Sequence, residues 1–235
     1  MDIENKKLAT NDMLVKYFND GVTKVLSEHF DVKCCEKGHD WFTPWEGHQR
    51  KAFDLYALKG YMYIIRWGYN YDFIPTRKNG EKFIYHRTEK AVAVHIPDSF
   101  YLHVDYDPDK MSHNETLAIR EKYCLSSYNL EYMNLTDVAS AYEYIQEITR
   151  RNIPFMLEFF DRIRTVDDAV AEIDRRLEYS SDFPNVGLYY KKAFLHAYRQ
   201  EMDKAVNSLE KLYENGISES LMARLEKAYE AGQSE

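Results

Sequence analysis

Cysteine is scarce in this chain of 235 residues, and its spacing is not that of a disulfide framework. Cys34 and Cys35 are adjacent, Cys124 is distant, and no C-x-x-C pair exists among the 3 cysteines. Such usage is typical of a reducing, intracellular compartment. We therefore expect a cytoplasmic protein.

Long apolar runs are missing as well. The amino-terminal segment, residues 1–7, lacks the apolar core of a secretory signal. No apolar run approaches the roughly 20 residues that a membrane helix needs. The sequence therefore predicts no membrane association.

The motifs of common enzyme classes are absent too. The chain has no glycine-rich dinucleotide or phosphate loop, no H-E-x-x-H metal motif and no G-x-S-x-G nucleophile turn. We therefore predict no cofactor and name no catalytic residue, and the balance of these absences points away from an enzyme. Catalysis by residues that only the fold brings together stays open.

Positive charge is in deficit, since the net charge is −8. Residues 1–110 hold 16 Lys+Arg against 17 Asp+Glu, a net charge of −1, whereas residues 111–235 hold 15 against 22, a net charge of −7. Phosphate recognition needs clustered Lys and Arg, so we predict no binding to nucleic acid. The acidic second half is typical of a solvated face, and it would also suit a basic protein partner.

Aromatic side chains are abundant: they make up 15% of the chain, which has 20 Tyr. In a strand over residues 61–73 they would alternate and share one face, because strand side chains point to opposite sides. That face would carry Tyr61, Tyr63, Ile65, Trp67, Tyr69, Tyr71 and Phe73. Apolar helices are predicted before and after the sheet, so we interpret this face as the wall that they cover.

The fold class predicted is α+β, with one antiparallel sheet of five to seven strands covered on one face by helices. Two-residue turns at 37–38, 59–60 and 79–80 each contain glycine and favour hairpins. The predicted strands are residues 32–35, 40–43, 51–58, 61–73, 81–86, 91–96 and 100–107.

Apolar residues at helical spacing predict helices on both sides of the sheet. Pro154 is expected to break or restart one of them, and Thr165 is expected to cap another. The predicted helices are residues 12–30, 114–124, a longer one from 136, 155–163 and 165–177, then three short ones at 189–199, 203–214 and 219–230.

A boundary is predicted at residues 180–184, which cluster turn formers. It divides an α+β domain, residues 1–180, from a helical extension, residues 185–231. The spacing of Tyr189, Ala193, Ala205 and Leu209 resembles a single tetratricopeptide repeat. One repeat cannot form the usual peptide groove, so we favour a helical hairpin packed on the main domain.

Candidate binding residues lie opposite the aromatic face. Arg66, Asn70 and Asp72 share that second face, and a structural pair of Arg66 with Asp54 or Asp72 is favoured over an anion site. His86 and Arg87 follow in a connection between strands. They could bind an anion, although an exposed turn is the simpler interpretation.

Two other groups carry chemistry-bearing side chains. His103, Asp105 and Asp107 would share one face of a strand and could bind a divalent metal, but a half-solvated strand shows the same pattern, so no metal is predicted. Residues 38–48 hold two His and two Trp. Packing of the Trp side chains across the sheet end is favoured over a mobile loop at a pocket.

Residues 66–75 and 85–90, within a region of about 12–178, resemble a bacterial domain-of-unknown-function family of small α+β proteins. The resemblance implies a helix before an antiparallel sheet and closing helices after it. It carries over no catalytic residue.

Two functions follow as hypotheses. The first is a non-enzymatic protein that binds a basic partner, for example as an immunity protein binds and neutralises a basic toxin. The second is a small-molecule-binding protein or hydrolytic enzyme that uses a pocket at Arg66, His86 and Arg87. The sequence predicts neither the identity of the ligand nor the oligomeric state.

Overall fold

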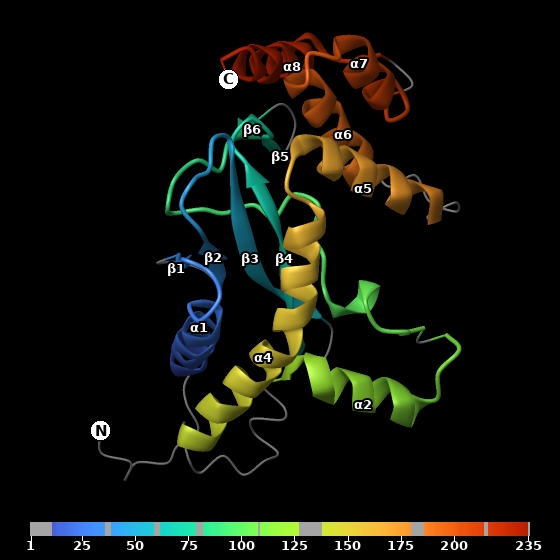
Figure 1. Cartoon of the computed structure of the whole chain (residues 1–235). Coiled ribbons are helices and arrows are strands. Elements are labelled where there is room, and N and C mark those ends of the chain that lie inside the picture. The colour runs from blue at the N-terminus through green and yellow to red at the C-terminus, as the bar shows by residue number, and fades with distance from the viewer. Residues whose placement is uncertain are drawn as a thin grey trace.

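A computed structural model describes residues 11–35, 39–58, 62–78, 82–107, 109–126, 138–179, 186–213 and 216–234. These residues form an α+β fold, as predicted (Figure 1). No helix within these ranges is both long enough and apolar enough to cross a membrane. The predicted turns at 37–38, 59–60 and 79–80 and the predicted boundary at 180–184 lie outside the described residues.

The main sheet is antiparallel, with its strands in the order β1-β2-β3-β4-β7. Its centre is the long pair β3 and β4, in which Phe53 lies opposite Trp67 and Asp54 opposite Arg66. A separate two-stranded sheet, β5-β6, follows. The strands are β1 (Lys33–Cys34), β2 (Asp40–Phe42), β3 (Gln49–Leu58), β4 (Met62–Tyr71), β5 (Thr76–Lys78), β6 (Lys82–Ile84) and β7 (Leu125–Ser126).

The prediction of one sheet of five to seven strands is therefore wrong in its composition. The strands expected at residues 91–96 and 100–107 are not formed, β5 and β6 stand apart from the main sheet, and β7 was not expected. Residues 95–98 instead lie along the edge of β4, where Trp67 and Asp98 form an isolated bridge. Phe100–Leu102 is a short 3-10 helix, η1.

The aromatic face of β4 is a wall of the core. Trp67 and Tyr71 on this face are fully buried, and Tyr69 packs edge-on against Phe160 at a ring distance of 5.3 Å. The covering helices are α1 (Asn11–Leu26) and α4 (Val138–Arg162), which also pack against each other. The predicted role of this face, as a surface that helices cover, agrees with this packing.

The opposite face of β3 and β4 is covered by the connection that follows β6. A Cβ atom placed on Gly68 would lie 2.8 Å from the carbonyl oxygen of Ile96 and 2.9 Å from Val94 Cγ1. Only glycine allows this approach, because any side chain would push the connection off the sheet. Around Gly68 both faces of the central strands are thus buried, whereas Tyr56 on the same face of β3 is exposed.

Two predicted helix starts are formed by side-chain caps. Ser112 and Glu115 make a reciprocal capping box at the start of α2 (His113–Tyr123). Thr165 Oγ1 accepts a hydrogen bond from the backbone of Asp168, whose carboxylate accepts one from Thr165, at the start of α5 (Val166–Tyr179). Pro154 lies inside α4, which continues through it, so the expected break is absent.

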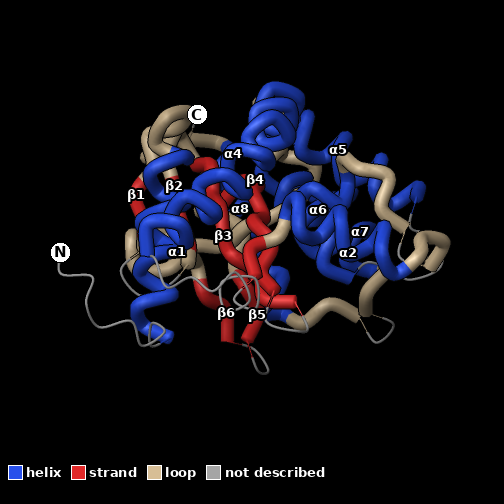
Figure 2. Tube along the Cα trace, turned by 90° about the horizontal axis from the view of Figure 1, so that it is seen from below, coloured by secondary structure: helices blue, strands red, loops and turns tan. Residues whose placement is uncertain are grey.

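The carboxyl-terminal part consists of α6 (Val186–Tyr198), α7 (Met202–Glu210) and α8 (Glu219–Gly232). These helices pack on the end of the sheet: Tyr198 stacks on Phe73 with ring centroids 4.2 Å apart, and the Tyr190 hydroxyl donates to the carbonyl of Pro75. Figure 2 shows α5, α6 and α7 on one side of β3 and β4 and α1 on the other.

Candidate ligand site between the sheet and the carboxyl-terminal helices

Arg66 forms the structural pair that the sequence favoured. Its Nε and Nη2 donate to the two carboxylate oxygens of Asp54, on the neighbouring strand, at 2.8 and 2.5 Å. Its guanidinium also lies over the Tyr56 ring. These contacts stabilise the sheet. They also use the Nε and Nη2 edge of the guanidinium, which is the edge that would bind an anion in a bidentate manner.

Asn70 is fully buried and accepts hydrogen bonds from Arg50, a residue that the sequence analysis missed. Arg50 is only 2% exposed and lies between the rings of Phe42 and Trp45, each 4.4 Å away. Its Nη2 also points to the backbone carbonyls of His86, Thr88 and Ala91 at 3.1 to 3.4 Å. Arg50 therefore fastens the connection over the sheet, and Asn70 positions Arg50.

The other three candidates also make contacts within the fold. Asp72 accepts a hydrogen bond from His48 Nδ1 at 2.9 Å, and its backbone carbonyl accepts one from Arg87 Nε at 2.8 Å. Both ring nitrogens of His86 are buried without a described hydrogen-bond partner, and burial lowers the pKa of His86. The structure thus links Asn70, Asp72, His86 and Arg87 around Arg50, and sets Arg66 apart.

The two Trp side chains of residues 38–48 are structural, as favoured. Trp41 is fully buried and donates to Thr23 Oγ1 of α1, and Trp45 covers the Arg50 guanidinium. The indole rings therefore hold the sheet end together.

His103 does not share a strand face with Asp105 and Asp107, because the chain forms η1 and turns there. Its Nε2 lies 3.2 Å from Asp98 and its ring stacks on Phe155. Within the described ranges, no group of three or more His, Cys, Asp or Glu side chains could hold a metal ion.

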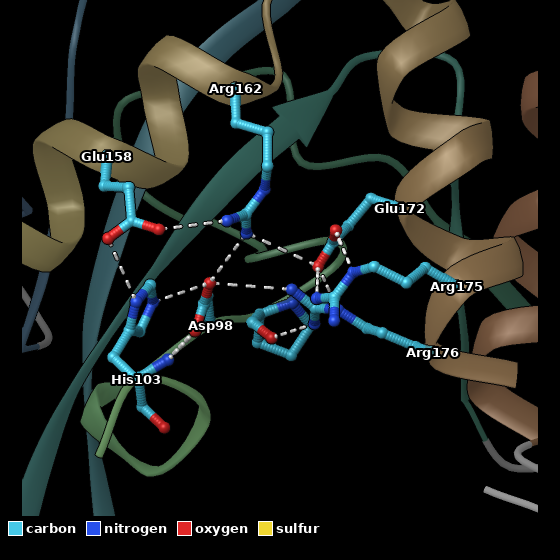
Figure 3. A network of polar contacts seen from close by, with 9 residues as sticks. Asp98, His103, Glu158, Arg162, Glu172, Arg175 and Arg176 are labelled. Atoms are coloured by element: carbon cyan, nitrogen blue, oxygen red, sulfur yellow. Dashed lines mark hydrogen bonds and ion pairs between the residues drawn. The ribbon is translucent and has the colours of Figure 1, made fainter. Parts of the chain in front are cut away.

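Asp98 and Glu172 form the centre of a buried ionic network (Figure 3). Three elements meet there: α4 contributes Arg162, α5 contributes Glu172 and Arg176, and the connection before η1 contributes Asp98. Asp98 Oδ2 lies 3.6 Å from Arg176 and 3.8 Å from Arg162, in addition to its contact with His103.

Glu172 completes the network. It accepts hydrogen bonds from Arg176 Nε at 2.6 Å and from Arg175 at 2.8 and 3.0 Å, while Arg176 also donates to the carbonyl of Pro97. Burial alone would raise the pKa of Glu172, but these arginines hold it below its ordinary value. Glu158, which pairs with Arg162 and lies 3.6 Å from His103, is the third carboxylate beside three arginines. The network therefore acts as a clamp between elements rather than as an anion site.

A cavity of about 420 Å³ lies between the segment from the end of β4 into β5, helix α6, and the turn that follows α7. We name it the Lys191 cavity. Its size falls within the range of small-molecule sites, about 300–1,000 Å³. It is lined by Ile74, Pro75, Thr76, Arg77, His95, Val186, Gly187, Tyr190, Lys191 and Tyr213.

His95 presents a buried donor to this cavity region. Its Nδ1 accepts a hydrogen bond from the backbone N–H of Tyr71 at 3.0 Å, so the proton of the neutral ring is on Nε2. His95 is 4% exposed, and its Nε2 has no partner among the described residues. Burial, followed by the charge of Lys191 and by His86, holds the pKa of His95 well below its ordinary value.

The left-handed backbone of the next residue helps to orient His95. Ile96 has a φ of 59°, a strained conformation for a β-branched side chain. The backbone N–H of His95 is fixed by the carbonyl of Tyr69 at 2.7 Å. Strained residues of this kind persist where the surroundings hold them, often beside a functional site.

Lys191 lies on α6 and is partly buried. Its ammonium makes no hydrogen bond or ion pair with any residue in the described ranges, whereas the adjacent Lys192 pairs with Asp174. Burial, with the charges of Arg66 and Arg176, lowers the pKa of Lys191 to about 8. An unpaired lysine in a mostly apolar cavity is costly for the fold, which makes it a candidate functional group.

The described lining of the Lys191 cavity contains several cationic and donor groups. Arg77, His95 and Lys191 are present, and none of the described lining residues is Asp or Glu. Arg77 donates to the Tyr213 hydroxyl and makes a further contact in the fold. The cavity is therefore complementary to an anion in a chain of net charge −8.

A second cavity, of about 360 Å³, has mixed charge. His48, which pairs with Asp72, lines it together with Tyr71 and Arg199, but Glu46 and Asp167 line it as well. Arg199 is held by Asp167 at 2.8 Å. Its lining therefore lacks the clear preference for one charge that the Lys191 cavity has.

Neither His95 nor Lys191 was among the predicted binding residues, although Lys191 left a detectable signal. Leu188, Phe194 and Leu195, at three- and four-residue spacings from it, are all buried. A charge on the apolar stripe of a helix is unusual and could have been noted. His95 left no comparable signal, because its tautomer and burial depend on a distant strand.

Comparison of the chain with protein-family models, with curated proteins and with solved structures finds no match. The resemblances to an α+β family and to a tetratricopeptide repeat thus stay predictions, and the site rests on its own geometry.

Proposed function

We propose that this protein binds a small anionic organic molecule in the Lys191 cavity. The anionic group is held by Lys191 and the Nε2–H of His95, and the apolar body contacts Ile74, Val186 and the aromatic rings of the lining. The observation that carries this proposal is a largely apolar cavity in which the described residues supply two donors without a partner, Lys191 and His95 Nε2, and no carboxylate.

The physical reason is that such a ligand supplies the hydrogen-bond acceptors and the negative charge that the described lining residues do not provide. A buried donor without a partner costs about 1–3 kcal/mol, and an unpaired buried charge costs more. A carboxylate or phosphate would accept from both donors and neutralise Lys191. An uncharged ligand of the same shape would leave that cost in place.

Calorimetric titration tests the proposal, with octanoate as the probe and octanol as its uncharged control. At pH 7 we expect octanoate to bind and octanol to bind at least about tenfold more weakly, a difference of about 1.4 kcal/mol. Lys191→Met should abolish the preference for octanoate, and Lys192→Met should retain it, because Lys192 pairs with Asp174 outside the cavity lining.

The pH dependence follows from the lowered pKa of Lys191. Because Lys191 loses its proton near pH 8, octanoate affinity should fall as the pH rises through that value. His95, whose pKa burial holds well below its ordinary value, is neutral throughout this range and adds no pH dependence. Equal affinity of octanoate and octanol, or affinity that Lys191→Met leaves unchanged, would contradict the proposal.

We also retain the expectation of a cytoplasmic protein. The free thiols support it: no cysteine forms a disulfide, and burial raises the pKa of Cys34 to about 11. The division into an α+β domain and a helical extension, and the basic protein partner, are likewise retained as predictions. Salt-sensitive capture of a defined basic protein by the purified chain would support the partner.

A further inference from the structure

We infer that Lys191 forms a reversible imine with a ligand that carries both an aldehyde or ketone group and an acid group. This inference rests on the proposed function and specifies the class of ligand. It depends on the position of a single amine that is open to the cavity and without a partner.

The surroundings of Lys191 favour nucleophilic chemistry. An amine that pairs with a carboxylate is held as an ammonium ion and cannot attack a carbonyl. Lys191 has no such pair among the described residues, and the charged neighbours that act on it, Arg66 and Arg176, are both positive. The residues that the structure describes in the lining add Arg77 and the neutral His95 but no Asp or Glu. Each of these features favours the neutral amine.

The lowered pKa of Lys191 sets the fraction of its side chains that are neutral amines. With a pKa of about 8, roughly one Lys191 side chain in ten is a neutral amine at pH 7. For an ordinary lysine, with a pKa near 10.4, the fraction is below about one in a thousand. Lys191 is thus expected to react about 100-fold faster than a solvated lysine of equal nucleophilicity.

The reaction needs no further reagent. The nitrogen lone pair of Lys191 attacks the carbonyl carbon, a proton passes from nitrogen to the carbonyl oxygen, and a carbinolamine results. Loss of that oxygen as water forms the C=N bond, and addition of water reverses the step. The acid group of the ligand can remain bound to the Nε2–H of His95, which has no other partner among the described residues.

Lys192 supplies a matched control on the same helix. It follows Lys191 directly but forms an ion pair with Asp174 and does not line the cavity. Its amine is bound to a carboxylate, so it should react more slowly than Lys191. The comparison removes differences in expression, fold and position along the chain.

Reductive trapping tests the inference. The full chain is incubated with 4-carboxybenzaldehyde and cyanoborohydride at pH 7, and the modified lysine is identified by peptide mass spectrometry. We expect a single carboxybenzyl group on Lys191, at least about tenfold faster than on Lys192. Benzaldehyde, which lacks the acid group, should react more slowly, and octanoate should compete.

Variants separate this inference from the proposed function. Lys191→Arg keeps the positive charge but cannot form an imine, so it should bind octanoate and yield no adduct. Lys192→Met should be modified as the unaltered protein is. If octanoate binds but labelling shows no preference for Lys191, the imine is excluded and anion binding stands. If octanoate does not bind and 4-carboxybenzaldehyde does not label Lys191, both the anion site and the imine are excluded.

Discussion

Buried polar side chains in this protein are of two kinds, those with partners in the fold and those without. Arg50 and Asn70 belong to the first kind, because Nε and Nη2 of Arg50 both donate within the fold and two aromatic rings flank its guanidinium. Among the described residues, His95 Nε2 and the Lys191 ammonium belong to the second. The two kinds respond in opposite ways to substitution, and that difference separates structural from functional residues.

Replacement of Arg50 by Lys should destabilise the protein by about 2–4 kcal/mol, because a single ammonium cannot reach Asn70 and the carbonyls of 86–91 together. Urea denaturation followed by fluorescence measures the change. Arg164→Lys is the control, since Arg164 is exposed and pairs with Asp161 on the surface. A loss below about 0.5 kcal/mol for Arg50→Lys would show that the connection is held in another way.

Asp40 carries a charge that the fold disfavours. Burial, and then the charge of Asp54, raises its pKa to about 6 despite the opposing effect of Arg66. A raised pKa in an acid means that stability is lost as the pH rises from about 4 through 6.

Asp40→Asn should therefore raise the melting temperature at pH 7.5 by about 2–4 °C, equivalent to about 1 kcal/mol after allowance for solvent screening. At pH 4 the gain should vanish, because both proteins are then uncharged at this position. Melting curves of both proteins at the two pH values measure this gain in melting temperature. An equal gain at pH 4 and pH 7.5 would show that it does not come from removal of the Asp40 charge.

Among the elements, the connection over residues 94–98 joins the sheet to the candidate site. It is fixed at the edge of β4 through Trp67 and Asp98, it approaches Gly68 closely, and it carries the strained Ile96 next to His95. Its geometry therefore sets the position of the His95 ring.

Gly68→Ala should destabilise the protein by about 1–3 kcal/mol, since the added methyl group would overlap Val94 and the carbonyl of Ile96. Adding Val94→Ala should recover part of this loss, because it removes one of the two close atoms. Chemical denaturation of the single and double variants measures the coupling. Additive effects of the two substitutions would argue against direct contact.

The clamp of Asp98 and Glu172 joins α4 and α5 to this connection, and it predicts sensitivity to acid. The pKa of Glu172 is lowered in the fold, so its contribution to stability is present above its ordinary pKa of 4.5 and is lost as the pH falls below that value.

Glu172→Gln should remove that part of the acid sensitivity and should destabilise the protein at pH 7 by about 3–5 kcal/mol, because three arginines lose a buried partner. Denaturation at pH 3.5, 5 and 7 tests this. The two proteins should converge as the pH falls. A constant gap at all three pH values would show that Glu172 does not act through its charge.

Some elements could be predicted from sequence and others could not, for physical reasons. Capping residues such as Ser112 and Thr165 act over three or four positions, so the starts of α2 and α5 are encoded locally. Residues 91–96 have strand composition, but the backbone contacts of this connection with β4 are made by His95 and, after the predicted strand, by Asp98. Strand β7, only two residues long, depends on the edge of β4 and gives no local pattern.

The candidate site shows the same limit. Pairing of Arg66 with Asp54 followed from strand neighbours and was predicted, whereas Arg50 is close to Asn70 only through the register of β3 and β4. The Lys191 cavity combines residues 74–77 with residues more than 100 positions later, on α6 and at Tyr213 after α7. No local pattern could bring these together.

At the scale of the whole molecule, one buried apolar cluster continues from α1 through the sheet and α4 into the carboxyl-terminal helices. Phe18, Trp67, Phe159, Phe194 and Leu225 all belong to it. The Lys191 cavity lies where the sheet end meets these last helices, a usual position for ligand sites. The ligand should therefore stabilise the whole fold and not one helix alone.

The melting temperature of the unaltered protein and of Lys191→Met, each with and without octanoate at pH 7, tests the central claim most directly. Without octanoate, Lys191→Met should melt about 2–4 °C higher, because a buried, unpaired charge has been removed. Octanoate should raise the melting temperature of the unaltered protein and leave that of Lys191→Met unchanged. A less stable Lys191→Met, together with an unaltered protein that octanoate does not stabilise, would contradict the account and mark Lys191 as structural.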